Sequence, residues 1–522
     1  MIVFKDVSFA YSARQRVVCN LSVTINKGEK VCLLGLNGSG KSTLLKLAAG
    51  LLMPGNGHVL IDGDATDDQR AALKVRSQVG FIFQNPQDQI VATTIESDIA
   101  FTLENLAFPP DVMKKRVEEM AQRFGLIDLL KRHPEAISAG EEQRTALAGT
   151  LAPSPSILLL DEPTSFLDYA GKERLREILF TDATTILAAT QFPSEALQFE
   201  RVLLLDQGQL VFDGSADALF TSQTWQQLKT DSDAIQTTKK KQYSASAIGD
   251  RKESNVIEAE NVSFSYQAGT DAVREIDLAV STGEIIAIVG SSGSGKSSLG
   301  LLLSGLLTPT AGIIRYPSNQ EGDRLVGYLM QFPERQFFAD NVHDEVAFGI
   351  ESEQLPVNES KARVADSLAL VGLDYDSFAV RSPFTLSGGE QRRLALASLL
   401  VMNRPILILD EPTASLDWQG TQQLLELLHH LRRSGKTILI LSHDLDFVSR
   451  VADRLILLDK GRLRWSGAKF ATDFPTLLFE SQFGGLPQPL QQARQLHREG
   501  LSPIEIAKRL LNDQSSESGD LF

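Results

Sequence analysis

The sequence predicts a chain of two α/β domains in tandem, each with a mainly parallel sheet at its centre. A glycine-rich loop that begins at Gly35 occurs again at Gly290, and the two loops are 255 positions apart. In each half, apolar segments of strand length alternate with helical stretches, a pattern typical of buried parallel strands covered by helices. Asp161 and Asp410 keep nearly the same spacing, at 249 positions. Such a near-constant offset indicates a duplicated domain with short loop insertions.

Each half contains the same series of expected strands. The first half has them at Lys30–Leu34, Ser156–Leu160, Thr184–Ala189 and Val202–Leu205. Their counterparts in the second half are Ile285–Val289, Pro405–Leu409, Thr437–Leu441 and Leu455–Leu458. The first strand of each series leads directly into the glycine-rich loop, and that loop opens a leucine-rich helix. Each half is long enough to bury a core of its own.

Changes in composition indicate the domain boundaries. We expect a first domain at residues 1–229, a flexible linker at 230–254, a second domain at 255–483 and a C-terminal helical extension at 484–522. The linker is polar, and acidic residues flank its lysine run at 239–241, which favours a solvated charge cluster over a nucleic-acid contact. In the extension, Ser502–Glu505 matches a capping box, so a helix starts there. It faintly resembles part of a helix-turn-helix, but no basic helix follows, which favours a packing or dimer-contact element.

Composition and charge restrict the class of protein. The chain of 522 residues has a formal net charge of −15, whereas a nucleic-acid-binding surface normally shows a basic patch. We therefore expect no nucleic-acid partner. Cys19 and Cys32 lack the spacing of metal ligands. No apolar run approaches the length of a transmembrane helix, and the N-terminus lacks the pattern of a signal peptide. We expect a cytosolic chain that reaches a membrane only through partners.

The two glycine-rich loops carry the pattern of a P-loop. Their glycines let consecutive backbone N–H groups turn toward one anion, and the helix that follows favours negative charge at its N-terminus. Lys41 and Lys296 are expected near the β- and γ-phosphates, while Ser42 and Ser297 are expected to bind Mg²⁺. The residues expected to bind ATP are Gly35, Leu36, Asn37, Gly38, Ser39, Gly40, Lys41, Ser42 and Thr43 in the first half, and Gly290, Ser291, Ser292, Gly293, Ser294, Gly295, Lys296, Ser297 and Ser298 in the second.

An apolar strand that ends in a pair of acids follows each P-loop. These pairs are Asp161-Glu162 and Asp410-Glu411. Each aspartate is expected to hold Mg²⁺, directly or through water, and each glutamate to orient or deprotonate an attacking water. A strand ending in Asp-Glu is often only a strand end, but its recurrence after a P-loop in both halves favours a catalytic role.

A further motif lies between each loop and each acidic pair. It reads Leu386-Ser-Gly-Gly-Glu390 in the second half and Ile137-Ser-Ala-Gly-Glu141 in the first. Here the chain resembles the ATP-binding cassette (ABC) ATPases, whose signature is Leu-Ser-Gly-Gly-Gln, and the resemblance covers nearly all of residues 1–228 and 255–470. The matching signature residues are Ser138, Ala139, Gly140, Glu141, Ser387, Gly388, Gly389 and Glu390.

The resemblance implies further roles for matched residues. Gln84 and Gln331 match the glutamines that sense Mg²⁺ and water, and Asp168 and Asp417 match aspartates at the interface between two cassettes. His443 matches the switch histidine of the family. In the same way Tyr11 and Tyr266 would stack on adenine, although each is also compatible with an ordinary strand aromatic.

In that family two cassettes dimerise head to tail, so the resemblance implies an intramolecular pair with two composite sites. Site one joins P-loop 35–42, Glu162 and Gln191 to signature 387–389, and site two joins P-loop 290–297, Glu411 and His443 to signature 138–140. The halves differ because Gln191 replaces the switch histidine and Ala139 replaces a signature glycine. We expect site two to hydrolyse ATP faster and site one mainly to bind it. The alternative is that both sites work and the differences are neutral.

The segments after the two sensing glutamines resemble one group within this family. Residues 84–90 and 331–338 are similar to strings in the paired ATPases of energy-coupling factor (ECF) transporters, and residues 485–489 are similar to their C-terminal extension. The resemblance implies a protein at the cytoplasmic face of the membrane that drives uptake of a vitamin, a vitamin precursor or a metal ion. Its partners would be a transmembrane coupling protein and a substrate-binding membrane component. The transported solute is not readable from this chain.

Acidic residues near these segments would suit basic helices of such a partner. They are Asp88, Glu96, Asp98, Glu334, Asp344 and Glu345. A solvated helix face is the alternative reading. Two other functions also remain open at this point: a soluble twin-cassette factor that acts on ribosomes, and the fused ATPase of a sugar importer. The short polar linker and Gln191 disfavour the first, and the string at 331–338 disfavours the second.

Overall fold

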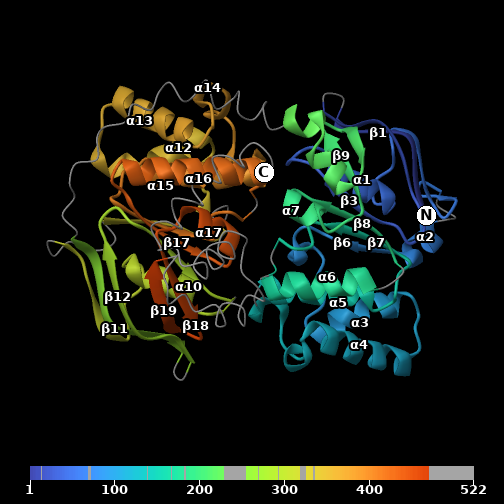
Figure 1. Cartoon of the computed structure of the whole chain (residues 1–522), viewed down its shortest axis with the longest axis horizontal. Coiled ribbons are helices and arrows are strands. Elements are labelled where there is room, and N and C mark those ends of the chain that lie inside the picture. The colour runs from blue at the N-terminus through green and yellow to red at the C-terminus, as the bar shows by residue number, and fades with distance from the viewer. Residues whose placement is uncertain are drawn as a thin grey trace, which may run out of the picture. The chain divides into compact units, whose positions relative to one another are not determined.

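The protein forms two compact units, which lie within residues 1–227 and 254–468 (Figure 1). The structure is a computed structural model, and the residues that it describes are 1–12, 15–68, 72–137, 139–165, 167, 169–181, 184–227, 254–267, 270–291, 293–317, 325–332, 336–414 and 416–468. The linker predicted at 230–254, apart from Ser254, and the extension predicted at 484–522 lie outside this range. The two units are described separately.

A mainly parallel sheet forms the centre of the first unit. Within the described residues its strand order is β10-β9-β3-β8-β7-β6, and only β9 and β10 pair antiparallel. The strands are β3 (Lys30–Leu34), β6 (Val79–Ile82), β7 (Ile157–Asp161), β8 (Thr185–Thr190), β9 (Arg201–Asp206) and β10 (Gln209–Gly214). Nearly every residue of β3, β7 and β8 is buried, which explains why their sequences are apolar throughout. Parallel pairing brings the carboxyl ends of these three strands to one edge.

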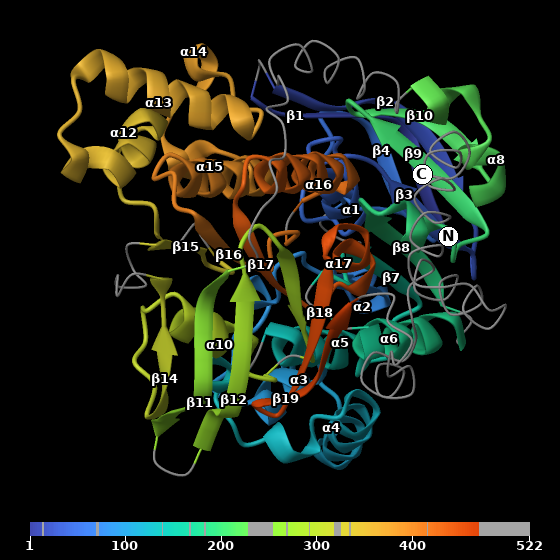
Figure 2. The same ribbon diagram turned by 60° about the vertical axis from the view of Figure 1, so that its left-hand side comes forward.

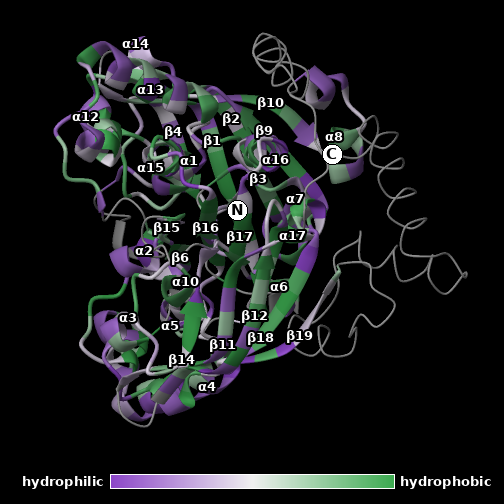
Figure 3. Ribbon diagram, turned by 90° about the vertical axis from the view of Figure 1, so that its left-hand side faces the viewer, coloured by the Kyte–Doolittle hydropathy of each residue, from purple (hydrophilic) through white to green (hydrophobic). Residues whose placement is uncertain are grey.

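The second unit repeats this sheet. Its order is β15-β16-β17-β13-β18-β19 among the residues that the structure describes, with β18 and β19 as the antiparallel pair. The strands are β13 (Ile285–Val289), β15 (Val326–Leu329), β16 (Ile406–Asp410), β17 (Thr437–Ser442), β18 (Arg454–Asp459) and β19 (Arg462–Ala468). Figure 3 shows how strongly hydrophobic residues gather in the strands. The carboxyl ends of β13, β16 and β17 therefore meet as those of β3, β7 and β8 do.

Each unit also has an antiparallel sheet. In the first unit it contains β1 (Ile2–Ser12), β2 (Gln15–Ile25), β4 (Asn56–Ile61) and β5 (Asp64–Ala65). In the second it contains β11 (Asn255–Gln267), β12 (Thr270–Ser281) and β14 (Ala311–Arg315), which lie side by side in Figure 2. The helix after each P-loop, α1 (Lys41–Ala48) or α10 (Lys296–Leu303), packs against strands of both sheets of its unit. One hydrophobic core in each unit thus holds the P-loop helix between two sheets.

A group of helices packs on a second core in each unit (Figure 1). In the first unit the group consists of α3 (Ile95–Asn105), α4 (Pro110–Phe124) and α5 (Ala139–Leu151), which contact one another. In the second it consists of α12 (Val342–Ala347), α13 (Val357–Leu370), α14 (Tyr375–Phe378) and α15 (Gly388–Leu400). Further helices are α2 (Ala72–Gln78), α6 (Tyr169–Thr181), α7 (Pro193–Ala196), α8 (Ala216–Phe220), α16 (Trp418–Arg433) and α17 (Leu445–Val451).

The structure confirms the predicted fold class of two tandem α/β domains with mainly parallel sheets. The strands predicted before the P-loops have the predicted bounds, and the other predicted strands differ by one residue at one or both ends. The antiparallel sheets were not predicted. No helix in the described ranges has the length and apolar character needed to cross a bilayer.

Candidate nucleotide-binding and catalytic sites

The two P-loops are folded around their lysines. Lys41 Nζ donates to the carbonyls of Gly35 and Leu36 at 2.9 and 3.0 Å. Lys296 Nζ makes the matching bonds to Gly290 and Ser291 at 2.8 and 3.1 Å. These contacts hold each ammonium inside the loop, at the N-terminus of the helix that follows. A phosphate placed there meets both a positive charge and the helix dipole.

Glycine is required at the last loop position for two reasons. Gly40 has φ 104° and Gly295 has φ 99°, in the left-handed region. A Cβ at Gly40 would also lie 2.6 Å from the carbonyl oxygen of Val17. The buried hydroxyls of Ser39 and Ser294 have no hydrogen-bond partner among the described residues. Such orphaned donors beside a cradle of backbone N–H groups fit an anion such as a nucleotide phosphate.

An aromatic side chain stands beside each P-loop helix. Tyr11, at the end of β1, has its hydroxyl oxygen 3.3 Å from Thr43 Oγ1. Tyr266, near the end of β11, has its hydroxyl oxygen 3.2 Å from Ser298 Oγ. Both rings are largely exposed to solvent. This placement leaves each ring available for an adenine, and the stacking role stays a prediction.

The residues expected to bind magnesium meet at the ends of β7 and β16. In the first unit Ser42 Oγ donates to Asp161 Oδ1 at 3.0 Å. Burial raises the pKa of both aspartates, although the nearby serines and P-loop lysines act in the opposite direction. No group of three acidic, histidine or cysteine side chains suited to a metal occurs in the described ranges. A single carboxylate with one hydroxyl fits Mg²⁺, which takes its other ligands from phosphate and water.

The two candidate catalytic glutamates have the same unusual backbone conformation. Glu162 has φ 48° and Glu411 has φ 47°, and their N–H groups donate to Ala189 and Leu441 on the neighbouring strands. A left-handed residue directly after a strand is sparsely populated and is typical of functional sites. Side chains alternate between the two faces along a strand, and this conformation ends that alternation after the preceding aspartate. Two adjacent carboxylates can therefore serve different tasks.

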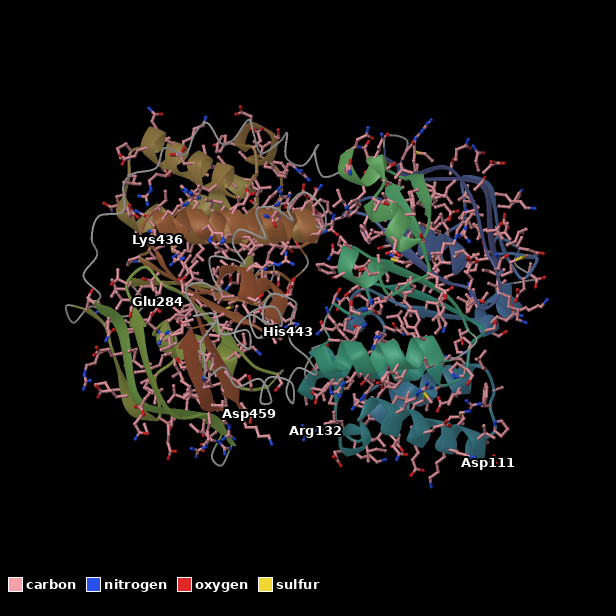
Figure 4. All side chains as sticks on the ribbon, viewed as in Figure 1. Asp111, Arg132, Glu284, Lys436, His443 and Asp459 are labelled. Carbon is pink, nitrogen blue, oxygen red and sulfur yellow. The ribbon has the colours of Figure 1, made fainter. Side chains whose placement is uncertain are left out.

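In the second unit, side chains of the neighbouring strand hold Glu411. His443 Nδ1 lies 2.9 Å from Glu411 Oε1, and Ser442 Oγ donates to Oε2 at 3.1 Å. His443, labelled in Figure 4, directly follows β17. Burial alone would raise the pKa of Glu411, but His443, Lys296 and Ser442 together hold it below its usual value. Glu411 is thus kept ionised and oriented, as a group that positions water must be.

In the first unit Glu162 has different partners. It accepts from Gln84 Nε2 at 3.3 Å and from Ser165 Oγ at 3.4 Å, and it lies 3.9 Å from Lys41 Nζ. No hydrogen bond joins it to Gln191 among the described residues, although Gln191 is fully buried. Burial, opposed by Lys41 and aided by neighbouring acids, raises the pKa of Glu162 to about 7. The structure therefore brings His443 onto Glu411 but does not bring Gln191 onto Glu162.

A second difference between the units was missed by the sequence reasoning. Thr190 stands where the second unit has Ser442, but its hydroxyl donates to Glu195 at 2.5 Å rather than to Glu162. Glu195 also accepts from Thr164 at 2.6 Å and pairs with Lys172 at 3.5 Å. The counterpart of Glu195 in the other unit is Phe447, so an alignment of the halves residue by residue reveals the change.

The aspartates at the ends of β7 and β16 also differ between the units. Tyr328 in β15 donates its hydroxyl to Asp410 Oδ2 at 3.0 Å. In the first unit Phe81 occupies the matching register in β6, two pairs before Asp161, and has no hydroxyl to donate. The printed contacts thus hold Asp410 through Tyr328 and Asp161 through Ser42.

The signature motif of the second unit begins a helix. Ser387 is the N-cap of α15 and forms a capping box with Glu390, whose carboxylate accepts from Ser387 N and Oγ at 2.8 and 2.9 Å. Gly388 and Gly389 form its first turn. In the first unit Ala139, Gly140 and Glu141 open α5. Ser138 and the P-loop residue Ser292 lie outside the described residues.

The predicted interface aspartates can be placed only in part. Asp417 is the N-cap of α16, and its Oδ1 accepts from Gly420 N at 2.8 Å. Asp168 lies outside the described residues. Gln331, the second sensing glutamine, follows β15, as Gln84 follows β6.

Two of the acidic residues predicted to face a partner are buried, and that prediction is wrong for them. Asp98 accepts backbone N–H bonds from Val91 and Ala92 at 2.9 and 3.1 Å. Glu345 accepts the same bonds from Phe338 and Ala339 at 3.1 and 2.9 Å.

These carboxylates fix the loop that follows each sensing glutamine instead of attracting a cation. The other predicted acids differ in their surroundings. Asp88 and Asp344 are exposed, Glu96 pairs with Lys131, and Glu334 lies outside the described residues.

The comparison with known proteins agrees with this geometry. A model of the ABC transporter family matches residues 18–165 and 273–414, more than half of the chain. An ABC transporter ATP-binding protein of Bifidobacterium longum is 34% identical over 503 residues, which are 87% of this chain but only 64% of that relative. One of Caldanaerobacter subterraneus subsp. tengcongensis is 30% identical over 520 residues, covering 89% of this chain and 91% of the relative.

A solved structure has a similar fold. The RNase-L inhibitor has a TM-score of 0.62 over 91% of this chain and 93% of its own, at 20% identity, which supports the fold alone. Paired P-loops, strand-end acids and two family matches lead to one conclusion. The chain belongs to the ABC transporter family and is a twin-cassette ATPase that binds and hydrolyses ATP.

Proposed function

We propose that this chain is the energy-coupling ATPase of an ECF-type importer. It would use ATP with Mg²⁺ to drive uptake of a vitamin, a vitamin precursor or a metal ion. Its partners would be a transmembrane coupling protein and a substrate-binding membrane component, which place it at the cytoplasmic face of the membrane. The names of its relatives, ABC transporter ATP-binding proteins, support a role in transport.

The observation that carries this proposal is a pair of exposed apolar sites beside the loop that follows each sensing glutamine. In the second unit Phe338 and Phe348 are 59% and 58% exposed, and their rings pack edge to face with centroids 4.7 Å apart. In the first unit Val91 and Phe101 occupy the matching positions and are also exposed. Exposed apolar groups on a fixed loop and helix suit a partner helix that inserts its apolar face.

The buried carboxylates explain why these sites can transmit force. Glu345 binds the backbone of Phe338 itself, and Asp98 binds that of Val91. The apolar groups are therefore attached to rigid elements instead of a free loop. In the first unit the same loop begins at Gln84, which touches Glu162. A partner that moves the loop can thus alter the surroundings of a catalytic glutamate.

In the proposed cycle the two cassettes close head to tail around ATP. Ser387 at the N-terminus of α15 would supply donors to the γ-phosphate held by P-loop 35–42, and Ser138 would do so for P-loop 290–297. Asp161 with Ser42, and Asp410 with Ser297, would hold Mg²⁺, which neutralises charge on the phosphates. Asp168 and Asp417 would lie at the interface. ATP then forms part of that interface, and hydrolysis weakens it.

The two sites are proposed to differ in rate. In site two His443 and Ser442 orient an ionised Glu411, which can position water. In site one Glu162 lacks both contacts, and the Thr190 hydroxyl donates to Glu195 instead. We therefore assign hydrolysis mainly to site two and nucleotide retention to site one.

Fractionation of cells that produce the tagged chain tests the proposal. The unmodified chain is expected in the membrane fraction, together with a polytopic membrane protein and a second membrane component that carries the solute. Phe338→Asp combined with Phe348→Asp should release it into the soluble fraction. Leu306→Asp is the matched control, because Leu306 is similarly exposed but follows α10 instead of the loop after Gln331. Sedimentation of the unmodified chain with ribosomes instead of membranes would contradict the proposal.

A further inference from the structure

A buried arginine joins the partner-facing loop of the second unit to its catalytic strand. Arg392 lies in α15 and is only 5% exposed. Its Nη1 donates to the carbonyls of Met330, at 3.5 Å, and of Gln331. Its Nη2 donates to the carbonyls of Asp410, at 3.1 Å, and of Glu411. One guanidinium therefore holds both the start of the loop and the end of β16.

The chemistry of the side chain explains this double attachment. Arginine presents several N–H donors in a rigid planar fork, so one group can bond two backbone segments at once. A buried charge is costly unless polar groups surround it, and these carbonyl oxygens supply that compensation. The two segments cannot separate without exposing the guanidinium to an apolar interior. Movement of one segment is therefore resisted by the other.

The first unit lacks this link. Gln143 occupies the position in α5 that Arg392 occupies in α15: each lies two residues after the signature glutamate, Glu141 or Glu390. Gln143 is fully buried, and its Nε2 donates to the carbonyl of Pro163 at 3.1 Å. Its Oε1 has no hydrogen-bond partner in the described part of the chain. The neutral, shorter side chain thus reaches the segment after β7 but makes no bond to the loop at Gln84.

We propose that Arg392 is a positioning residue that couples the partner-facing loop of the second unit to Glu411. The loop is defined here as residues 330–332 and 336–345. Displacement of this loop reaches the catalytic glutamate of site two through the guanidinium, and the reverse path carries the state of site two to the loop. Among the described residues of the first unit no single side chain bonds both segments: α5 contacts the loop through Glu142 and Gln87, and Gln84 contacts Glu162 through its own side chain. The inference rests on the proposed function, since it assigns the docking signal to one of two similar surfaces.

Hydrogen exchange in the full-length chain tests the coupling without any partner. Glu162→Gln is the background, so that hydrolysis reports site two alone. In this background ATP is expected to change the exchange rates of residues 326–332 and 336–345. Arg392→Gln, which installs the residue of the first unit, should abolish that response while ATP affinity stays within about twofold, because the four carbonyls that Arg392 bonds lie outside the P-loop. Single-turnover hydrolysis should fall about tenfold, within the usual range of coupling energies.

Two further variants keep the outcome interpretable. Arg392→Lys retains the charge but not the planar fork, so it should lose the loop response as Arg392→Gln does, even if the glutamine variant is poorly folded. Gln143→Leu is the matched control and should leave the response of residues 336–345 intact. The proposal is overturned if ATP still changes exchange in this loop in both Arg392 variants, or if it never does so in the background chain. A chain with normal coupling that fails to reach membranes would contradict the proposed function instead.

Discussion

The substitution His443→Gln gives the second unit the switch residue of the first. His443 contacts Glu411 at 2.9 Å, whereas Gln191 makes no hydrogen bond to Glu162 in the described residues. We expect the change to slow hydrolysis at site two, because Glu411 loses the partner that orients it. The histidine side chain is 30% exposed, so solvent weakens the pair only in part.

The size of the effect follows from the type of bond. A hydrogen bond to a charged group contributes about 1.5–3 kcal/mol, which corresponds to about a ten- to hundredfold change in rate. If Ser442 alone held Glu411 in place, the loss would be at the lower end of that range. The contact lies outside the P-loop, so ATP affinity should change by less than about threefold, or 0.7 kcal/mol.

Single-turnover hydrolysis in the Glu162→Gln background measures this step, with ATP affinity measured on the same samples. The matched variant is Gln191→His in the Glu411→Gln background, where only site one remains. Gln191→His should raise the rate at site one, but by a smaller factor than His443→Gln lowers the rate at site two. The reason is that the Thr190 hydroxyl still donates to Glu195 and leaves Glu162 without that hydrogen bond. Unchanged hydrolysis in His443→Gln would refute the orienting role assigned to His443.

Further substitutions test other contacts. Ser442→Ala should slow site two about fivefold, the loss of about 1 kcal/mol, whereas Thr190→Val should slow site one by less than twofold, as single-turnover assays would show. Tyr266→Ala should weaken binding of a fluorescent ATP analogue by about 1–3 kcal/mol if the ring stacks on adenine, and Tyr266→Phe should bind normally. Ile288→Val, at a fully buried position of β13, should lower the stability of the second unit by about 1 kcal/mol, measured as a fall in its thermal midpoint without loss of ATP affinity.

The parallel sheets were predictable because two local signals coincide there. Lys30–Leu34 and Ile285–Val289 are apolar runs that end at a glycine-rich loop, and both ends of each strand agree with the prediction. The antiparallel sheets escaped notice because their strands are half-exposed and irregular. In β1 the pairing with β2 shifts register repeatedly, which breaks the alternation that would have identified a strand.

Site residues that belong to a sequence motif could be predicted. Site residues whose role depends on burial could not. The P-loop lysines and the strand-end acids could be named from spacing alone. The roles of Asp98 and Glu345 could not be predicted, since in a sequence an acidic residue in the first turn of a helix looks like a surface charge. Their role depends on a loop folding back over the helix, which is a tertiary contact. Arg392 was missed for the same reason, because its acceptors are backbone carbonyls.

The rates of ATP hydrolysis in Glu411→Gln and Glu162→Gln test the central claim most directly. Under single-turnover conditions Glu411→Gln should nearly abolish hydrolysis, and Glu162→Gln should retain most of it, because only Glu411 has the histidine and serine that orient it. An equal loss in both variants would contradict the assignment of hydrolysis to site two.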